Sequence, residues 1–222
     1  MLQRILEPEV MDSAQEALDY DQMDHAPVNR VFVADFLAKG REFLAVLDVG
    51  AGTAQIPIEL CHRHPCVQVV AIDLAEEMLS VGRVNVERAG LAQRIQLQRC
   101  DAKRMPFEDA SFDAVISNSI VHHIPEPSTV FAEMVRVVKS DGLLFVRDLL
   151  RPVNDGTLRT LVETYAAGAN AHQKQMFGDS LHAALTLDEV RDLVSRLGFP
   201  AESVRATSDR HWTWAALKPR AV

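Results

Sequence analysis

Short apolar runs alternate along the chain with longer segments in which apolar residues recur every three or four positions. Most of the short runs carry few polar residues, which is typical of strands buried in a parallel sheet, while one alternates apolar with polar residues. We expect these strands at Phe43–Val49, Val67–Ile72, Ile95–Leu97, Phe112–Ser117 and Leu143–Val146. The segments between them predict helices at about Ala54–Arg63, Ala75–Ala89 and Pro127–Val138. This alternation predicts a doubly wound α/β domain.

Two helices are predicted before the first strand. Ser13 and Glu16 fit a capping box, which begins a helix that runs to about Met23. Pro27 suits the first turn of a second helix, and Gly40 suits its end. These helices form a leader in front of the α/β core.

The chain after the fifth strand predicts more helices and a final hairpin. Residues 154–185 carry apolar residues at helical spacing, and Thr186 with Glu189 fits a second capping box, for a helix that ends at Gly198. The last two expected strands are Val204–Thr207 and Trp212–Leu217. We therefore expect a helical insertion followed by an antiparallel hairpin at the edge of the sheet.

A glycine turn follows the first strand. Gly50 and Gly52 carry no side chain, so a ligand can approach the backbone, and the helix that follows favours a negatively charged group. The dinucleotide fingerprint fails, because its third position is Gln55. Asp48 would repel a pyrophosphate but would hold an ammonium group. The pattern thus favours a ligand with a cationic amine, and S-adenosylmethionine carries one.

Four motifs in order carry a family resemblance. Leu47-Asp48-Val49-Gly50-Ala51-Gly52-Thr53 resembles the first motif of class I S-adenosylmethionine-dependent methyltransferases. The other three motifs are Val70-Ala71-Ile72-Asp73, Cys100-Asp101-Ala102 and Phe112-Asp113-Ala114-Val115-Ile116-Ser117-Asn118. Together they cover roughly the middle half of the chain, and the group they resemble includes the small-molecule methyltransferases of ubiquinone and menaquinone biosynthesis.

The resemblance implies a binding role for eight residues. Asp48, Gly50 and Gly52 would hold the methionine end of S-adenosylmethionine, and Asn118 lies where the family contacts its ammonium group through a backbone carbonyl. Asp73, with Leu74 beside it, would bind the ribose, although Asp73 also suits the N-cap of the next helix. Asp101 and Ala102 would contact the adenine.

The resemblance also implies a Rossmann-like sheet of seven strands with an antiparallel last strand. We expect one methyltransferase domain over residues 1–222. Its parts would be a helical leader (1–42), a cofactor-binding core (43–150), a helical cap inserted after the fifth strand (151–200) and a terminal hairpin (201–222).

The segment after the fourth strand is the place where the chemistry is expected. It reads Asn118-Ser119-Ile120-Val121, which differs from the Asn/Asp-Pro-Pro-aromatic motif of DNA-amino and glutamine-amide methyltransferases. His122 and His123 follow, and an imidazole has a pKa suited to accepting a proton from a hydroxyl, thiol or acidic carbon. The alternative to a catalytic role is that one histidine packs against its neighbours and the other caps the following turn.

Candidates for contact with the acceptor come from the leader and the insertion. They are Tyr20, Tyr165, His172 and His182, and the alternative for each is an ordinary helix position. Asp148 and Arg151 either face the mouth of the substrate site or pair with each other.

Composition narrows the class of protein. The net charge is −8, which disfavours nonspecific binding to nucleic acid or to an anionic membrane. The stretch from Met1 to Val10 is too polar for a signal peptide, so we expect a cytoplasmic protein. Cys61, Cys66 and Cys100 show no disulfide framework, and the crowded Cys61–Cys66 segment cannot easily converge on one ion. We expect no metal.

The function expected from these features is methyl transfer from S-adenosylmethionine to a small organic acceptor, with S-adenosylhomocysteine as the product. A methyltransferase of RNA or protein and a binding protein without catalysis are the alternatives, and the lack of a basic cluster counts against RNA. The sequence identifies neither the acceptor nor the oligomeric state, for which a homodimer is one candidate.

Overall fold

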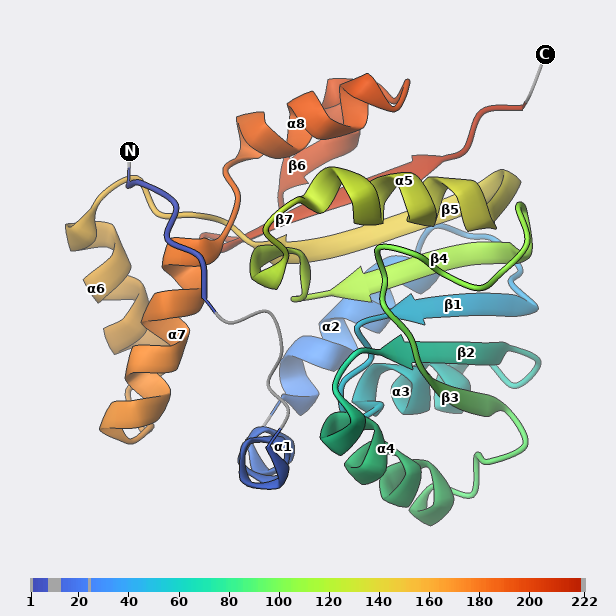
Figure 1. Ribbon diagram of the computed structural model, residues 1–222, viewed down its shortest axis with the longest axis horizontal. Coiled ribbons are helices and arrows are strands. Elements are labelled where there is room, and N and C mark those ends of the chain that lie inside the picture. Colours follow the sequence, from blue (N-terminus) through green and yellow to red (C-terminus); the bar gives the residue numbers. More distant parts are fainter. Residues whose placement is uncertain (1, 8–12, 24, 221–222) are drawn as a thin grey trace.

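A sheet of seven strands forms the centre of the molecule in the computed structural model, which describes residues 2–7, 13–23 and 25–220 (Figure 1). The strand order is β3-β2-β1-β4-β5-β7-β6. Strands β1 to β5 are parallel to their neighbours, whereas β7 is antiparallel to both β5 and β6. The strands are Ala45–Val49 (β1), Gln68–Asp73 (β2), Ile95–Arg99 (β3), Phe112–Asn118 (β4), Val138–Leu149 (β5), Val204–Ala206 (β6) and His211–Leu217 (β7). This arrangement confirms the predicted fold class.

Helices cover both faces of the sheet and bury an apolar core on each. One face carries α2 (Ala26–Leu37), α3 (Gln55–Arg63) and α4 (Glu76–Arg88), and its core contains Phe32, Phe36 and Phe145. The other face carries α5 (Pro127–Val137) and α8 (Leu187–Arg196), and its core contains Phe131 and Trp214. Burial of these aromatic side chains is the main force that holds the layers together.

Three helices lie beyond the carboxyl ends of the parallel strands (Figure 1). The leader helix α1 (Ala14–Gln22) packs on α4 through Ala17 and Met78. The insertion forms α6 (Asp155–Tyr165) and α7 (Ala171–Ala183), which share a small apolar core with Leu149. The expected leader and insertion are therefore both present.

Side-chain caps begin two of these helices where the sequence predicts them. The capping boxes of Ser13 and Thr186 both form. Asn170 and Gln173 form a third capping box at the start of α7, which the sequence analysis did not identify. Each satisfies backbone amides that would otherwise lack a partner.

The fifth strand starts earlier than expected. The sequence predicts a strand from Leu143, but β5 begins at Val138 and runs through Asp141 and Gly142. Asp141 adopts a left-handed conformation (φ 60°), and the pairing with β4 shifts from Phe112↔Val138 to Ala114↔Leu143. A bulge absorbs the extra residues, because backbone hydrogen bonds to Lys218 keep this stretch in the sheet.

None of the helices in the described ranges has the length and apolar character that crossing a membrane requires.

Candidate active site

A pocket lies at the carboxyl ends of β1, β2, β3 and β4, where open α/β sheets bind ligands. Seven of the eight residues with an expected binding role line it. They are Gly50, Gly52, Asp73, Leu74, Asp101, Ala102 and Asn118. Residues from four segments far apart in sequence thus line one pocket, because parallel strands end at the same edge of the sheet.

The glycine turn is open at Gly52 and closed at Gly50. Both residues are left-handed, with φ of 78° for Gly50 and 53° for Gly52. A Cβ on Gly50 would lie 2.0 Å from Cγ2 of Ile120, whereas a Cβ on Gly52 would meet only the Tyr20 ring, at 3.8 Å. The expectation that a ligand approaches the backbone therefore suits Gly52, while the Ile120 side chain packs against Gly50.

Asp73 braces the glycine turn. Its Oδ2 accepts a hydrogen bond from the Gly52 amide at 2.8 Å, and its Oδ1 accepts one from the Ala75 amide at 2.9 Å. The N-cap of α4 is Ala75 and has no side-chain cap, so the alternative role of Asp73 as N-cap is wrong. A carboxylate oxygen can accept more than one hydrogen bond, and Asp73 lines the pocket.

Asp48 is the one residue of the eight that does not line the pocket, and it is 1% exposed. Its Oδ2 has no hydrogen-bond partner among the described residues. Burial, together with the Asp73 carboxylate nearby, raises the pKa of Asp48 to about 8. A cation beside this carboxylate would favour its ionised form.

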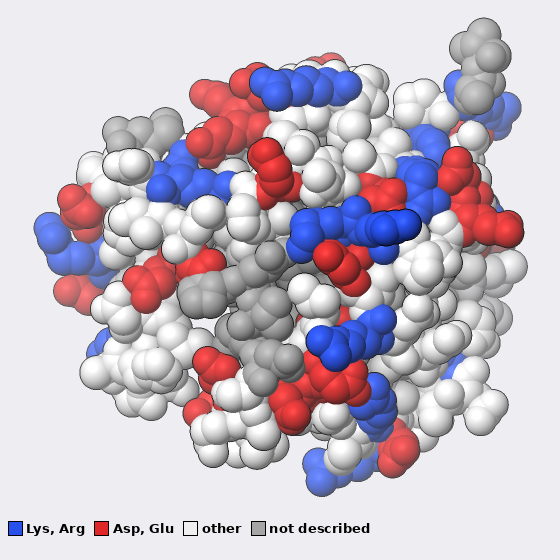
Figure 2. Space-filling view, viewed as in Figure 1, with Lys and Arg blue, Asp and Glu red and all other residues white. Residues whose placement is uncertain are grey.

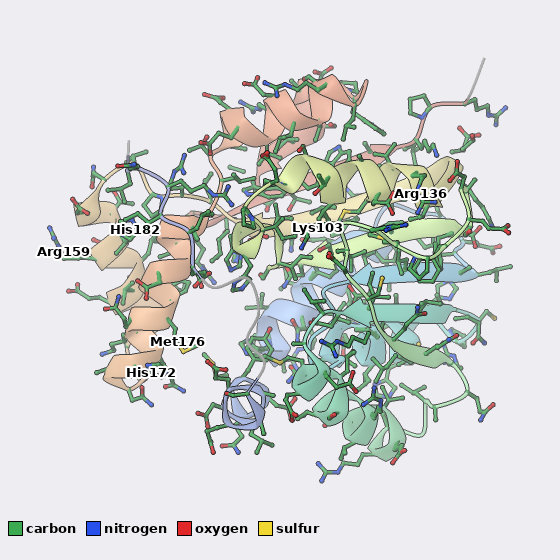
Figure 3. All side chains as sticks on the ribbon, viewed as in Figure 1. Lys103, Arg136, Arg159, His172, Met176 and His182 are labelled. Atoms are coloured by element: carbon green, nitrogen blue, oxygen red, sulfur yellow. The ribbon has the colours of Figure 1, made fainter. Side chains whose placement is uncertain are left out.

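The far wall of the pocket carries Asp101 and Lys103. The Asp101 side chain accepts a hydrogen bond from the Lys103 amide at 2.9 Å and pairs with the Lys103 ammonium at 3.1 Å. Figure 3 shows Lys103 on the loop that follows β3. On the opposite wall, the buried Oδ1 of Asn118 has no partner among the described residues.

The two candidate catalytic histidines have different surroundings. They form the short helix η1 (Val121–His123) directly after the turn that follows β4. The His122 side chain is 3% exposed and does not line the pocket, whereas His123 is 19% exposed and lines it. Only His123 is therefore placed to meet a ligand in the pocket directly.

A buried carboxylate orients His122. Asp148 Oδ1 lies 2.5 Å from His122 Nδ1, and Asp148 Oδ2 accepts from the backbone amides of Val121 and His122. Burial opposes the charged form of both side chains, but their attraction outweighs it, so the pKa of His122 is raised and that of Asp148 is lowered. Asp148 thus holds both the ring and the backbone of η1.

The N-terminal segment, residues 2–7, brings a second carboxylate to the histidines. Glu7 Oε1 lies 3.4 Å from His122 Nε2 and 3.3 Å from His123 Nδ1. Burial raises the pKa of Glu7 above its usual value. Because Glu7 is 14% exposed, this contact is largely shielded from water.

Arg4 fixes that segment. Its guanidinium donates to the carbonyl oxygens of His122, Ile124, Pro125 and Ala183, at 2.7–3.4 Å. The Ile5 amide also donates to the carbonyl of His182. The segment therefore joins η1 to the end of α7 beside the pocket (Figure 1).

The candidate acceptor contacts are not all near the pocket. Tyr20 lines it, and burial raises the pKa of Tyr20 to about 12. Tyr165 is exposed and donates to Asp209, away from the pocket. Figure 3 shows His172 at the outer end of α7 and His182 at the end that meets the N-terminal segment.

Neither expectation for Asp148 and Arg151 is right. Asp148 pairs with His122, and Arg151 pairs with Glu189 at 2.6 Å. Both are buried, so they lie under the site rather than at its mouth.

Sequence reasoning also missed Arg4, Glu7 and Ile120. The polar positions of the opening residues are the available signal for Arg4 and Glu7, but they indicate no partner. Nothing local in the sequence places Glu7 against two histidines far along the chain.

Comparisons with known proteins agree with this geometry. A family profile described as "Methyltransferase domain" matches residues 47–146. A malonyl-acyl-carrier-protein O-methyltransferase of Geobacter sulfurreducens is 34% identical over 193 residues, which cover 85% of this chain and 68% of that protein. A ubiquinone/menaquinone biosynthesis C-methyltransferase of Citrifermentans bemidjiense is 35% identical over 108 residues, 48% of this chain and 46% of that protein. The chain thus spans about two thirds of the first relative and about half of the second.

The fold also matches solved structures. A putative S-adenosyl-L-methionine-dependent methyltransferase from Methanococcus maripaludis superimposes with a TM-score of 0.74. The match covers 98% of this chain and 99% of that one at 17% sequence identity, which supports likeness of fold.

Proposed function

Because this chain belongs to the S-adenosylmethionine-dependent methyltransferases, we propose that it transfers a methyl group to a small organic acceptor in the pocket described above. The reacting methyl group is bonded to a positively charged sulfur in the cofactor. The proposal for the chain's own residues is that they bind and orient the two reactants and exclude water.

Two buried hydrogen-bond acceptors suit the cationic end of S-adenosylmethionine. Asp48 Oδ2 and Asn118 Oδ1 are buried without partners among the described residues, and a buried carboxylate is costly until a cation accompanies it. An ammonium group supplies both the charge and the hydrogen-bond donors. We assign the methionine end to Asp48, Gly52 and Asn118, with Gly50 shaping the turn.

The remaining wall suits the nucleoside. Asp73 lines the pocket at the end of β2 with a carboxylate that suits ribose hydroxyls, and Leu74 offers apolar contact beside it. Asp101 and Ala102 lie at the next strand end, where an adenine amino group and ring nitrogen would find an acceptor and a backbone donor. The residues of the pocket thus fit the cofactor over its whole length.

The observation that supports a small methyl acceptor is that the side of the pocket next to His123 is covered. Arg4 fixes residues 2–7 across η1 and the end of α7, and Tyr20 lies over the glycine turn. A pocket covered in this way leaves room for a small molecule rather than a folded partner. We propose that residues 1–222 act as one methyltransferase unit, in which the leader and the cap cover the core.

The charge distribution gives no support to an RNA substrate. Figure 2 shows acidic and basic side chains interspersed on the face that carries the leader and the cap, with no broad basic area. The net charge of −8 acts in the same direction. A protein substrate and a binding protein without catalysis remain as outcomes of the test.

The test follows a labelled methyl group from S-adenosylmethionine into a cell extract divided by ultrafiltration. We expect label in the low-molecular-mass filtrate with the wild-type protein and much less with Asp48→Asn. Label confined to the retained fraction would instead identify a macromolecular substrate. Binding of S-adenosylhomocysteine with no label in either fraction would support the binding protein.

A further inference from the structure

Three potential metal ligands converge beside the pocket. Glu7 comes from the N-terminal segment, and His122 and His123 come from η1. One ligand atom from each residue lies within 4.8 Å of the other two, and Glu7 Oε1 faces both His122 Nε2 and His123 Nδ1. Over the described ranges, no other set of His, Cys, Asp or Glu side chains converges in this way.

The spacing of these atoms suits a shared ion. The two distances from Glu7 Oε1 are 3.4 Å and 3.3 Å, longer than a good N–H···O hydrogen bond of about 2.7–3.2 Å. Zinc binds nitrogen and oxygen ligands at about 2.0–2.2 Å, and tetrahedral geometry then separates two ligand atoms by about 3.3–3.5 Å. Glu7 is therefore spaced from each imidazole as two ligands of one ion would be.

The ring of His122 is oriented for coordination. Asp148 Oδ1 lies 2.5 Å from Nδ1, and an ionised carboxylate can only accept, so Nδ1 carries the hydrogen and donates it. In the neutral ring the lone pair then lies on Nε2, which faces Glu7. A carboxylate behind a histidine ligand is the arrangement that fixes such ligands in metal sites.

We propose that Glu7, His122 and His123 bind one divalent transition-metal ion, for which zinc is the best fit. Two imidazoles and a carboxylate are suitable ligands for zinc, and three protein ligands leave a coordination position open. His123 lines the pocket, so the ion would lie beside the pocket in which we propose that the methyl acceptor binds. This proposal replaces the sequence-based expectation of a protein without metal.

The proposed metal site also indicates the chemical class of the methyl acceptor. This assignment rests on the proposed function. A metal ion at an open position binds oxygen or sulfur and lowers the pKa of a bound hydroxyl or thiol. The acceptor would therefore present such a group to η1. The ion would at the same time link the N-terminal segment to the core through Glu7.

The test titrates metal-free protein with cobalt(II), whose absorption spectrum reports tetrahedral coordination, and then displaces it with zinc. We expect one equivalent to bind to the wild-type protein. Glu7→Gln and His123→Asn should each lower the affinity by at least about 100-fold, because loss of a ligand exceeds the 10- to 100-fold effect of losing an outer partner. His172→Asn and Glu163→Gln are matched controls at exposed positions and should bind as the wild type does.

Three outcomes would overturn the proposal: no binding to the wild type, binding that is equal in all variants, or binding that both controls also lose. A weak hydrogen bond from a proton on His122 Nε2 to Glu7 would then account for the 3.4 Å separation. Circular dichroism of each variant excludes unfolding as the cause, and two independent ligand variants keep the test decisive if one fails to fold.

A separate titration keeps this proposal distinguishable from the proposed function. Calorimetry with S-adenosylhomocysteine on metal-free wild-type protein tests the cofactor pocket alone. Cofactor binding without cobalt binding would refute only the metal site. Cobalt binding without cofactor binding would refute only the proposed function.

Discussion

Asp48 is the residue whose charge state links stability to ligand binding. The folded protein keeps this carboxyl protonated up to about pH 8, whereas the ordinary pKa of the group is 3.8. Unfolding therefore releases a proton between these values, so the contribution of Asp48 to stability falls as the pH rises through this window, by up to about 1.4 kcal/mol per pH unit. Below the window both states are protonated, and above it both are ionised.

Asp48→Asn should remove this pH dependence. We expect urea unfolding between pH 5 and pH 7 to show a smaller loss of stability with rising pH than in the wild type. The comparison uses the slope of the unfolding free energy against pH. Its absolute value is not used, because the asparagine also buries an amide NH₂ group and this changes stability at every pH. The exposed substitution Asp155→Asn serves as control, and an unchanged slope in Asp48→Asn would show that Asp48 is ionised in the folded protein.

The same substitution should weaken cofactor binding. S-adenosylhomocysteine keeps the ammonium group, and a charged hydrogen bond contributes about 1.5–3 kcal/mol, so calorimetry should show an affinity about 10- to 100-fold lower. Equal affinity for the wild type and Asp48→Asn would mean that the ammonium group lies elsewhere. The sequence predicted that Asp48 holds a cation, but its burial and its altered pKa depend on packing that local sequence does not show.

Gly50 and Gly52 should differ in their tolerance of alanine. Gly50→Ala places a Cβ 2.0 Å from Ile120, in addition to the left-handed strain that both substitutions introduce. We expect about 1–2 kcal/mol of destabilisation for Gly52→Ala and about 1–3 kcal/mol more for Gly50→Ala. Ile120→Ala should recover part of the steric cost in the double variant with Gly50→Ala, because it removes Cγ2 and Cδ1 but leaves a Cβ 2.9 Å away. Urea unfolding measures each value. A double variant no more stable than Gly50→Ala alone would contradict the steric explanation.

At the scale of elements, Arg4 decides whether the N-terminal segment stays on the core. Its three guanidinium nitrogens contact four carbonyl oxygens on η1, the residues after it and α7. Arg4→Gln should release residues 2–7 and destabilise the protein by about 1–3 kcal/mol. Arg4→Lys should not restore the attachment, since one ammonium group cannot reproduce the planar donor set.

Limited proteolysis with subtilisin, read by mass spectrometry, measures this release. Cleavage within the first residues should be faster in both Arg4 variants than in the wild type. Arg159→Gln removes an arginine that Figure 3 shows on α6, away from the N-terminal segment, and should leave the cleavage rate unchanged. Equal cleavage in all four proteins would show that other contacts hold the segment.

Elements differ in how far the sequence predicts them. Strands β1, β2 and β4 and helices α3, α4 and α8 follow from apolar periodicity and caps, because those signals are local. The bulge at Asp141 does not, since the bonds that keep it in the sheet come from the far end of the chain, at Lys218. The contact of Glu7 with His122 and His123 escaped prediction for the same reason.

At the scale of the whole molecule, the cofactor motifs predict a ligand site because the topology brings distant strand ends together. That rule depends only on strand order and direction, so four sequence motifs were enough to predict seven residues that line the pocket. No such rule places the leader and the cap. Tyr20 lines the pocket and Tyr165 does not, although both are aromatic residues of predicted helices.

Hydrogen exchange should reveal which parts of the molecule respond to the cofactor. The pocket is lined by the glycine turn, the starts of the loops after β2 and β3, η1 and Tyr20 of α1, whereas α6 and the β6–β7 hairpin contribute no residue to it. We expect saturating S-adenosylhomocysteine to slow exchange in α1, in residues 50–54 and in residues 118–124. Exchange in α6 and in residues 204–217 should not change, because those segments are held by contacts remote from the pocket, such as that of Tyr165 with Asp209. Protection that spreads through α6 would instead show that the cap closes on the cofactor itself, and the site would then be completed by binding rather than formed in advance.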